Sequence, residues 1–431
     1  MRVLIMGSPT TKGNECFGNH QKISGGGWVE NLIDGLSESK DAQLDLAVCF
    51  YAGFTNKVRK QNYLGVCYYA LPLMDKALNT FNDEMLRDLK EVVRDFNPDV
   101  VHIIGTEREH DLRLAEIAGF DKTVCSITGL TSVYAGHYLG GIDRKEFKRL
   151  SLGDVYRRGG PIKEQKKFKK WGRSERELIS KAKYVMGRTT WDYACVKQIN
   201  PDINYTYCGE ILNPLYNEHK WDISKIKRHR IFVSQATYPL KGFHKLLEAF
   251  PIILNFYPDS EIVIAGADIL NNSGLMARIK RTTYAEYLIR LIKKLNIPMD
   301  KIRYTGPLNA KQMVEQYLAA NVFVLPSEIE NSPNSLGEAM LLGMPCVASC
   351  VGGVQDMLKD KKDGFIYPFD EPYMLAHYIC EIFGNDNLAA ELGKSAADSA
   401  KERFDPKKVT ATTIEAYKRI ISDQGVENEQ Q

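Results

Sequence analysis

Short apolar runs alternate with helix-like segments along most of the chain, and this alternation constrains the fold more than any other feature. The first runs predict strands at 2–6, 44–50, 64–71, 99–105 and 123–128. Segments with helical spacing fall between them, for example at 28–37 and 81–96. Such alternation predicts a mostly parallel sheet with helices on both faces.

The pattern restarts in the second half. Strands are predicted at 230–235, 261–267, 301–306, 321–327 and 345–350, and helices at 242–256, 276–295, 310–319, 333–342, 371–384, 387–403 and 406–421. A chain of 431 residues is too long for one ordinary core, so we expect two α/β domains, each a doubly wound, Rossmann-like parallel sheet. We place them at 1–208 and 209–405, followed by a C-terminal helix and tail at 406–431.

Composition points to a cytoplasmic protein. The formal net charge is only +3, and no apolar run approaches the ~18 residues that span a bilayer. The first residues, "MRVLIMGSPTTKG", lack the long apolar core of a signal peptide. The nine cysteines form no C-x-x-C pair, which favours reduced thiols over a disulfide framework or a zinc site.

The stretch "PSEIENSPNSLGEAMLLGMP" (326–345) follows a predicted strand and therefore lies at a carboxyl edge, where ligands of open parallel sheets bind. Ser332 and Pro333 resemble an N-cap and a first helical residue. The amides of the next three residues would then attract a phosphate. These three residues are Asn334, Ser335 and Leu336.

Two glutamates, Glu330 and Glu338, stand eight residues apart around this helix start. A carboxylate accepts hydrogen bonds from two hydroxyls at once, so each glutamate suits a sugar diol. An anion site between two such acceptors suits a nucleotide sugar. The alternative is that one glutamate is solvated and the other only favours a helix start.

The extended stretch "PSEIENSPNSLGEAMLLGMPCVASCVGG" resembles the glutamate-x7-glutamate segment of glycosyltransferase family 4, whose members are retaining enzymes of the GT-B fold. The resemblance implies two Rossmann-like domains that face each other across a cleft, acceptor-binding first and nucleotide-sugar-binding second. It implies that Glu330 holds the donor sugar and Glu338 the ribose. It also implies that the last helix returns to domain one.

Lys241 and Gly242 open a helix after the first strand of the second domain. The lysine can neutralise a diphosphate as a point charge. The family usually adds an arginine five residues earlier, but this chain has Ala236 there. Side chains that could compensate are Ser234, Gln235 and Tyr238. The "YPLKG" form resembles bacterial capsule and exopolysaccharide transferases.

Other motifs match the family's layout. The turn "RYTGPL" resembles the one that holds the nucleotide base, with Gly306 and Leu308 beside the ring. In domain one, Gly26 and Gly27 belong to a glycine-rich loop that lets backbone approach a phosphate.

Four further residues are candidates for the acceptor or phosphate side. Many family members have a histidine after the fifth strand, where this chain has Thr128. Glu107 and His137 could substitute for it. Arg188, in "GRTTWD", either faces the cleft or only supports it.

The segment 144–173 is strongly basic, with twelve Lys or Arg against three acidic residues. It predicts peripheral contact with an anionic membrane at the inner face, with Phe168 and Trp171 as interfacial anchors. The alternative is a solvated basic helix. Nothing else predicts nucleic-acid binding.

The sequence predicts a retaining hexosyltransferase that moves a sugar from a nucleoside diphosphate sugar to a glycan or lipid-linked glycan, in cell-surface polysaccharide synthesis. No D-x-D pair occurs, so neither a metal nor a bound cofactor is expected. The alternatives are another GT-B enzyme, such as a UDP-sugar 2-epimerase or a phosphorylase, and a non-catalytic sugar-nucleotide-binding protein.

Overall fold

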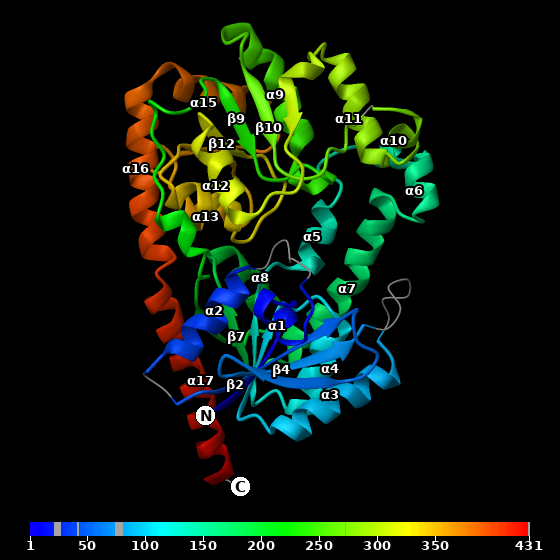
Figure 1. Ribbon diagram of the computed structural model, residues 1–431, viewed down its shortest axis with the longest axis vertical. Helices are drawn as coiled ribbons and strands as arrows, with labels where there is room; N and C mark the ends of the chain where they lie inside the picture. The colour runs from blue at the N-terminus through cyan, green and yellow to red at the C-terminus, as the bar shows by residue number, and fades with distance from the viewer. Residues whose placement is uncertain (21–26, 41–42, 74–80, 272, 430–431) are drawn as a thin grey trace. The chain divides into compact units, whose positions relative to one another are not determined.

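The computed structural model describes residues 1–20, 27–40, 43–73, 81–271 and 273–429, which form two compact units (Figure 1). The first unit contains Met1–Ser132, Lys170–Asn213 and Phe404–Gln431, and the second contains Val133–Lys169 and Pro214–Arg403. Residues 133–169 thus group with the second unit, although they lie within the sequence range that we assigned to the first domain.

The first unit is built on an eight-stranded sheet, counted over the described residues, in the order β3-β4-β2-β1-β5-β6-β7-β8. All neighbouring strands are parallel except β3 and β4. The strands are β1 (Arg2–Met6), β2 (Asp45–Ala52), β3 (Arg59–Tyr63), β4 (Val66–Pro72), β5 (Val100–Ile104), β6 (Thr123–Ser126), β7 (Tyr184–Gly187) and β8 (Asn204–Tyr207).

Helices cover both faces of this sheet (Figure 1). They are α1 (Thr11–Cys16), α2 (Gly27–Glu38), α3 (Asp83–Phe96), α4 (Glu109–Ala118), α8 (Thr190–Ile199) and α17 (Pro406–Glu429). Two more, α5 (Thr131–His137) and α7 (Pro161–Lys181), belong partly to each unit.

In the described part of the second unit, six strands form a wholly parallel sheet in the order β11-β10-β9-β12-β13-β14. Its strands are β9 (Arg230–Val233), β10 (Glu261–Ile264), β11 (Ile302–Tyr304), β12 (Val322–Leu325), β13 (Cys346–Ser349) and β14 (Phe365–Tyr367). The prediction of two doubly wound parallel sheets is confirmed. The strand β12 is buried along its whole length, as expected for a strand covered on both faces.

The α-helices of the second unit are α6 (Leu152–Tyr156), α9 (Phe243–Phe256), α10 (Leu275–Ile279), α11 (Thr283–Lys294), α12 (Ala310–Leu318), α13 (Asn334–Leu341), α14 (Val354–Met357), α15 (Pro372–Gly384) and α16 (Asp386–Arg403). Its short 3-10 helices are η1 (Arg144–Phe147), η2 (Pro214–Asn217), η3 (Pro239–Lys241) and η4 (Met299–Lys301). Among the described residues, no helix has the length and apolarity needed to cross a membrane.

Several elements differ from the sequence prediction. The strands β3, β7, β8 and β14 were not predicted. The edge strand β3 reads "RKQNY" and is mostly exposed, so it carries no apolar signal. The helix predicted at 276–295 is two helices, α10 and α11, because the Thr282 side chain caps a new start by accepting from the Ala285 amide.

The strand order locates where each unit can bind a ligand. In the second unit β9 lies between β10 and β12, so the connections that leave β9 and β12 run to opposite sides of the sheet. Such a switch point opens a crevice at the carboxyl ends of the strands. The loops at 234–242 and 326–333 begin there.

The C-terminal helix α17 lies beside α2 and is tied to the first sheet by a buried hydrogen-bond chain (Figure 1). His102 Nδ1 lies 2.7 Å from the Tyr417 hydroxyl, and His102 Nε2 lies 2.6 Å from Ser126 Oγ. Burial lowers the pKa of His102 to about 3, so its ring is neutral, with one nitrogen donating and the other accepting.

The variant Tyr417→Phe should lower the free energy of unfolding by about 1–3 kcal/mol, because it leaves a buried ring nitrogen of His102 without a partner. Urea denaturation measures the change. The control is Tyr373→Phe, at an exposed tyrosine, which should leave the stability unchanged. Equal stabilities for both variants would contradict this role of the hydroxyl.

Candidate functional site

Lys241 and Glu330 meet at the switch point of the second sheet. Lys241 ends η3 in the loop after β9, and Glu330 lies in the loop after β12. The Lys241 ammonium donates to Glu330 Oε1 at 2.6 Å, and the Ser327 hydroxyl donates to the same oxygen at 2.7 Å. Two residues 89 positions apart thereby form one charged cluster in a mostly buried setting.

Backbone contacts fix both partners. Gly242 has a φ of +67°, and a Cβ on it would lie 1.6 Å from the Pro326 carbonyl oxygen. On the other side, a Cβ on Gly352 would lie 1.9 Å from the carbonyl oxygen of Glu330. Only glycine allows approaches this close, so the loops are pressed together and the ion pair is pre-positioned.

Lys241 remains charged in this cluster. Burial alone would lower its pKa, but the Glu330 carboxylate and the Tyr238 hydroxyl outweigh it, and the pKa is raised. An ammonium has three donors, and only one is needed for Glu330. The cation can therefore serve an added anion as well as its carboxylate partner.

The start of α13 differs from the predicted one. Pro333, not Ser332, is the N-cap, and the helix begins at Asn334. The Ser332 hydroxyl lies 3.6 Å from Met357 Sδ. The Ser332 hydroxyl therefore does not cap α13, contrary to the prediction.

This start also changes the set of free amides. The Leu336 amide already donates to the Pro333 carbonyl at 3.0 Å, so it is not a free phosphate donor. The amides of Asn334 and Ser335 have no backbone acceptor among the described residues. Two amides, rather than the predicted three, are available at this helix end.

Glu338 lies one turn into α13 and is held by phenol groups. The Tyr317 hydroxyl is 3.0 Å from Glu338 Oε2 and also 3.0 Å from the Ser335 carbonyl oxygen. Burial raises the pKa of Glu338 to about 7, although hydrogen bonds from Tyr317 and Tyr216 lower it. The two glutamates therefore have different environments, because one faces an ammonium and the other faces neutral hydroxyls.

The remaining predicted residues of the second unit line the same sheet edge. Gly306 has a φ of +79°, and its carbonyl accepts from the Gly266 amide at 3.0 Å. Leu308 and Ser234 are half-buried, in the loops that follow β11 and β9. Ala236, which stands where the family usually has an arginine, is fully buried.

The sequence analysis missed Ser327, Tyr317 and the pair Glu328–His137. His137 Nδ1 lies 3.2 Å from Glu328 Oε1, and this hydrogen bond raises the pKa of His137. Glu328 Oε2 is buried without a partner among the described residues. The spacing S-x-x-E in "PSEIE" signals Ser327, but nothing in the sequence links His137 to Glu328, which lies 191 residues away.

In the first unit, Thr128 donates to Glu107 Oε1 at 3.0 Å, so these two predicted residues are paired. Arg188 is 4% exposed and donates to the buried Glu210 at 2.6 Å, with its guanidinium 4.3 Å from the Trp28 ring centre. This arrangement favours the supporting role for Arg188. Gly27 begins α2, and Gly26 lies outside the described residues.

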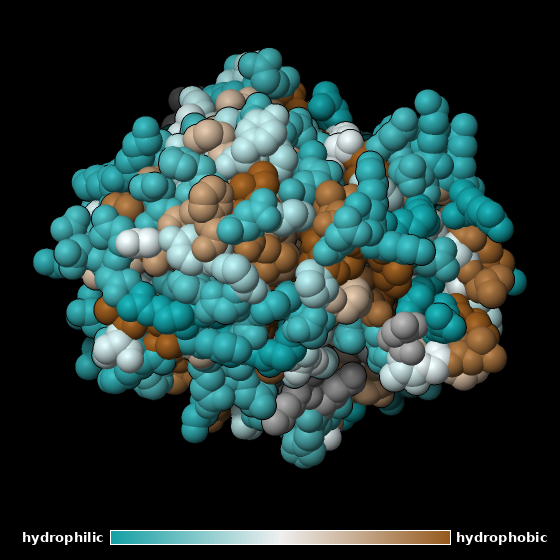
Figure 2. All heavy atoms as spheres, turned by 90° about the horizontal axis from the view of Figure 1, so that it is seen from above, coloured by the Kyte–Doolittle hydropathy of each residue, from teal (hydrophilic) through white to brown (hydrophobic). Residues whose placement is uncertain are grey.

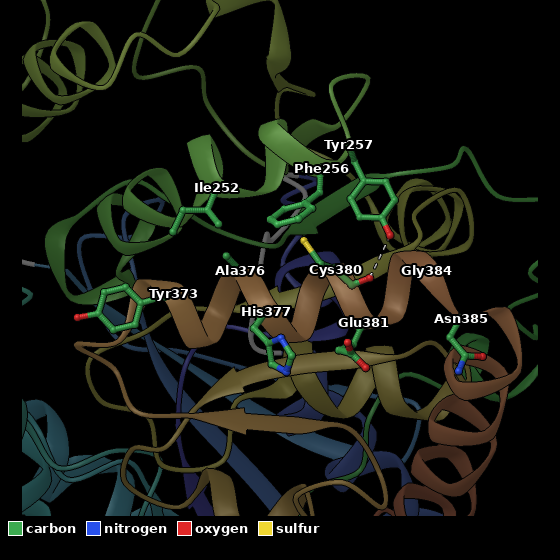
Figure 3. A pocket seen from close by; sticks show the side chains of 10 residues that line it. All are labelled: Ile252, Phe256, Tyr257, Tyr373, Ala376, His377, Cys380, Glu381, Gly384 and Asn385. Atoms are coloured by element: carbon green, nitrogen blue, oxygen red, sulfur yellow. Dashed lines mark hydrogen bonds between the residues drawn. The ribbon is translucent and has the colours of Figure 1, made fainter.

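A pocket of about 490 Å³ lies at the other end of α9 from Lys241, between α9 and α15 (Figure 3). Ile252 and Phe256 line it from α9, and Ala376 and Cys380 from α15. None of the predicted site residues lines this pocket. Among the described residues, no group of three or more His, Cys, Asp or Glu is placed to hold a metal ion.

Comparison with known proteins bears on the second unit. Residues 217–399 match the family model of glycosyl transferases group 1. This matched region includes Lys241, Glu330 and Glu338. A D-inositol 3-phosphate glycosyltransferase of Streptomyces scabiei is 30% identical over 187 residues, 43% of this chain and 40% of the relative. Spore coat protein SA of Bacillus subtilis is 25% identical over 45% of this chain and 49% of its own. The chain thus spans less than half the length of these curated relatives.

Solved structures match over nearly the whole chain. Sucrose-phosphate synthase from Thermosynechococcus elongatus has a TM-score of 0.71 at 15% identity, covering 98% of this chain and 100% of that one. HepE of Anabaena, in complex with UDP-glucose, has a TM-score of 0.64 at 14% identity, covering 97% and 100%. At these identities the likeness shows the fold alone, which is GT-B, as predicted.

The raised pKa of Glu338 predicts a pH-dependent stability. Between pH 4.5 and about pH 7 the unfolded chain ionises this carboxyl while the folded chain keeps it protonated. The protonated Glu338 carboxyl therefore stabilises the folded state fully below pH 4.5. This stabilisation, about 3 kcal/mol, is lost as pH rises through 7. Relative to the wild type, Glu338→Gln should gain stability from pH 5 to pH 8.

Urea denaturation at several pH values measures this difference. The control is Glu315→Gln, at an exposed glutamate of the same unit. If the difference in unfolding free energy between Glu338→Gln and the wild type stays constant with pH, this carboxyl does not titrate as expected.

Proposed function

We propose that this protein is a retaining glycosyltransferase of family 4 that uses a nucleoside diphosphate sugar as donor. The observation that carries the proposal is the charged cluster of Lys241, Glu330 and Ser327 at the switch point, beside two free amides of α13. The match of residues 217–399 to glycosyl transferases group 1 supports it.

The cluster suits the charge that develops during transfer. As the bond between the sugar carbon and the diphosphate breaks, negative charge grows on the leaving phosphate. Lys241 and the amides of Asn334 and Ser335 can stabilise that charge without a metal, and such stabilisation is commonly the largest catalytic effect. Donors already fixed in place require little rearrangement during the reaction.

The glutamates have separate proposed roles. Glu330 accepts hydrogen bonds from hydroxyls of the donor sugar, since Lys241 and Ser327 occupy only part of its acceptor capacity. Glu338, which already accepts from Tyr317, accepts hydrogen bonds from the two ribose hydroxyls. Gly306 and Leu308 lie against the nucleotide base, and Ser234 and Gly242 lie near the phosphates.

Retention follows from attack on the face that the leaving group vacates. The acceptor oxygen bonds to the sugar carbon as the carbon–phosphate-oxygen bond breaks, and the acceptor proton passes to the leaving phosphate. We propose that the acceptor is a glycan or lipid-linked glycan of a cell-surface polysaccharide, and that the enzyme is cytoplasmic. The proposed acceptor or phosphate side consists of Gly26, Gly27, Glu107, Thr128 and His137.

The variant Glu330→Gln tests the sugar-binding role. It keeps the shape and the hydrogen bond from Ser327, but it removes the charge that orients the sugar. We expect the transfer rate to fall at least about tenfold while nucleoside diphosphate affinity is kept, because misplaced reactants react more slowly. Mass spectrometry of products from a panel of nucleotide sugars measures the rate, with Glu315→Gln as control. An unchanged rate would refute the assignment.

The variant Lys241→Gln tests the phosphate role. We expect calorimetric titration with UDP and GDP to show at least about tenfold weaker binding, the loss of one charge-assisted contact. Because Lys241→Gln leaves a buried carboxylate unpaired, the double variant Lys241→Gln/Glu330→Gln separates lost contact from local disruption. Lys311→Gln, at an exposed lysine, is the control. Full affinity in both Lys241 variants would exclude this residue from the site.

A further inference from the structure

Exposed apolar side chains concentrate at one place in the second unit. Seven of the fourteen large apolar side chains that are exposed in the described residues lie on or beside α6 and α10, among them Tyr156 at 89% and Leu275 at 73% exposure. The seven are Leu150, Leu152, Val155, Tyr156, Leu275, Met276 and Ile279. We call residues 148–158 and 275–281 the α6–α10 tip.

Polar contacts join the two segments into one surface. The Ser151 hydroxyl donates to the Arg281 carbonyl at 2.8 Å, and the Thr283 amide donates to Asp154 Oδ2 at 2.7 Å. A Cβ on Gly153 would lie 2.2 Å from the Arg281 carbonyl oxygen, so the backbones touch where glycine permits it. Segments about 130 residues apart in sequence are therefore held side by side.

The tip is also strongly basic. Its cations are Lys148, Arg149, Arg157, Arg158, Arg278, Lys280 and Arg281. The one acidic residue in these two ranges is Asp154, which is buried and engaged by the Thr283 amide. The solvent-facing charge of these ranges is therefore entirely positive. Figure 2 shows brown apolar side chains at the right-hand edge, where α6 and α10 lie in Figure 1, among teal hydrophilic ones.

The aromatic anchors predicted from the sequence belong elsewhere. Phe168 packs against Tyr138, with ring centres 4.8 Å apart, and Trp171 lies 3.9 Å from the Arg108 guanidinium. Both rings are half-buried, so neither is an exposed anchor. Within 144–173, the exposed large apolar side chains lie at 150–156, and α10 adds others that the sequence did not suggest.

We propose that the α6–α10 tip docks on an anionic lipid bilayer. The exposed side chains enter the interface between headgroups and acyl chains, and the surrounding cations meet lipid phosphates. A nucleic acid would use the cations but offers nothing to Leu152, Leu275 and Met276, which are aliphatic. This proposal does not depend on the glycosyltransferase activity, since lipid binding is measured without donor or acceptor.

Vesicle flotation with the full chain tests the apolar contribution. The wild type should float with vesicles of phosphatidylcholine mixed with phosphatidylglycerol and remain unbound with phosphatidylcholine alone. Leu152→Ser/Tyr156→Ser should weaken binding at least about tenfold, since two inserted side chains are lost. The matched control is Phe256→Ser/Tyr373→Ser, which alters two side chains of the same unit that are 71% and 62% exposed, and it should bind like the wild type.

A charge series tests the electrostatic contribution. Lys148→Gln/Arg149→Gln/Lys280→Gln should weaken binding by about a hundredfold, because each basic residue at an anionic leaflet multiplies the affinity about fivefold. Lys311→Gln/Lys359→Gln/Lys362→Gln, at exposed lysines of the same unit, should lose much less. Equal flotation on neutral vesicles, equal losses in tip and control variants, or binding to a homopolymeric RNA but not to vesicles would each overturn the proposal.

Discussion

The close approach of Gly242 to the Pro326 carbonyl is the constraint on which the candidate site depends. It joins the loops after β9 and β12, which the strand order sends to opposite sides of the sheet. A side chain at position 242 would force the loops apart, and the Lys241 ammonium would no longer reach Glu330 at 2.6 Å. Gly352 supports the same arrangement from the far side of Glu330. The geometry of the charged cluster is thus set by backbone contacts rather than by the charges themselves.

Two carboxylates within one short segment, Glu330 buried and Glu338 half-buried, are stabilised in different ways. Glu330 is paired with a cation and a hydroxyl, so its charge is balanced within the protein. Glu338 accepts hydrogen bonds from the phenol groups of Tyr317 and Tyr216, and burial raises its pKa to about 7. A ligand that brings hydroxyl donors to Glu338 would favour the ionised form. The cost of keeping this carboxyl buried is typical of a site prepared for a partner that the free protein lacks.

The second unit therefore combines two surfaces of different chemistry. The switch-point cluster concentrates charge in a nearly closed setting, whereas the α6–α10 tip exposes apolar groups among cations. Both arise where segments distant in the chain meet through glycine, at Gly242 and at Gly153. Together, the two proposals have one unit bind the soluble donor and also contact the membrane at which a lipid-linked acceptor resides.

The sequence by itself determined the fold class, because buried parallel strands need continuous apolar runs and the runs recur in two sets. It also singled out Lys241, Glu330 and Glu338 as candidates, through their positions around helix starts and through the resemblance to glycosyltransferase family 4. Edge strands such as β3 escaped prediction because an exposed strand needs no apolar pattern. Only the tertiary structure decided that Lys241 pairs with Glu330, that Tyr317 holds Glu338, that Arg188 is buried against Glu210, and that α10 completes the tip. The physical reason is that each depends on contacts between segments distant in the chain, which local spacing does not encode.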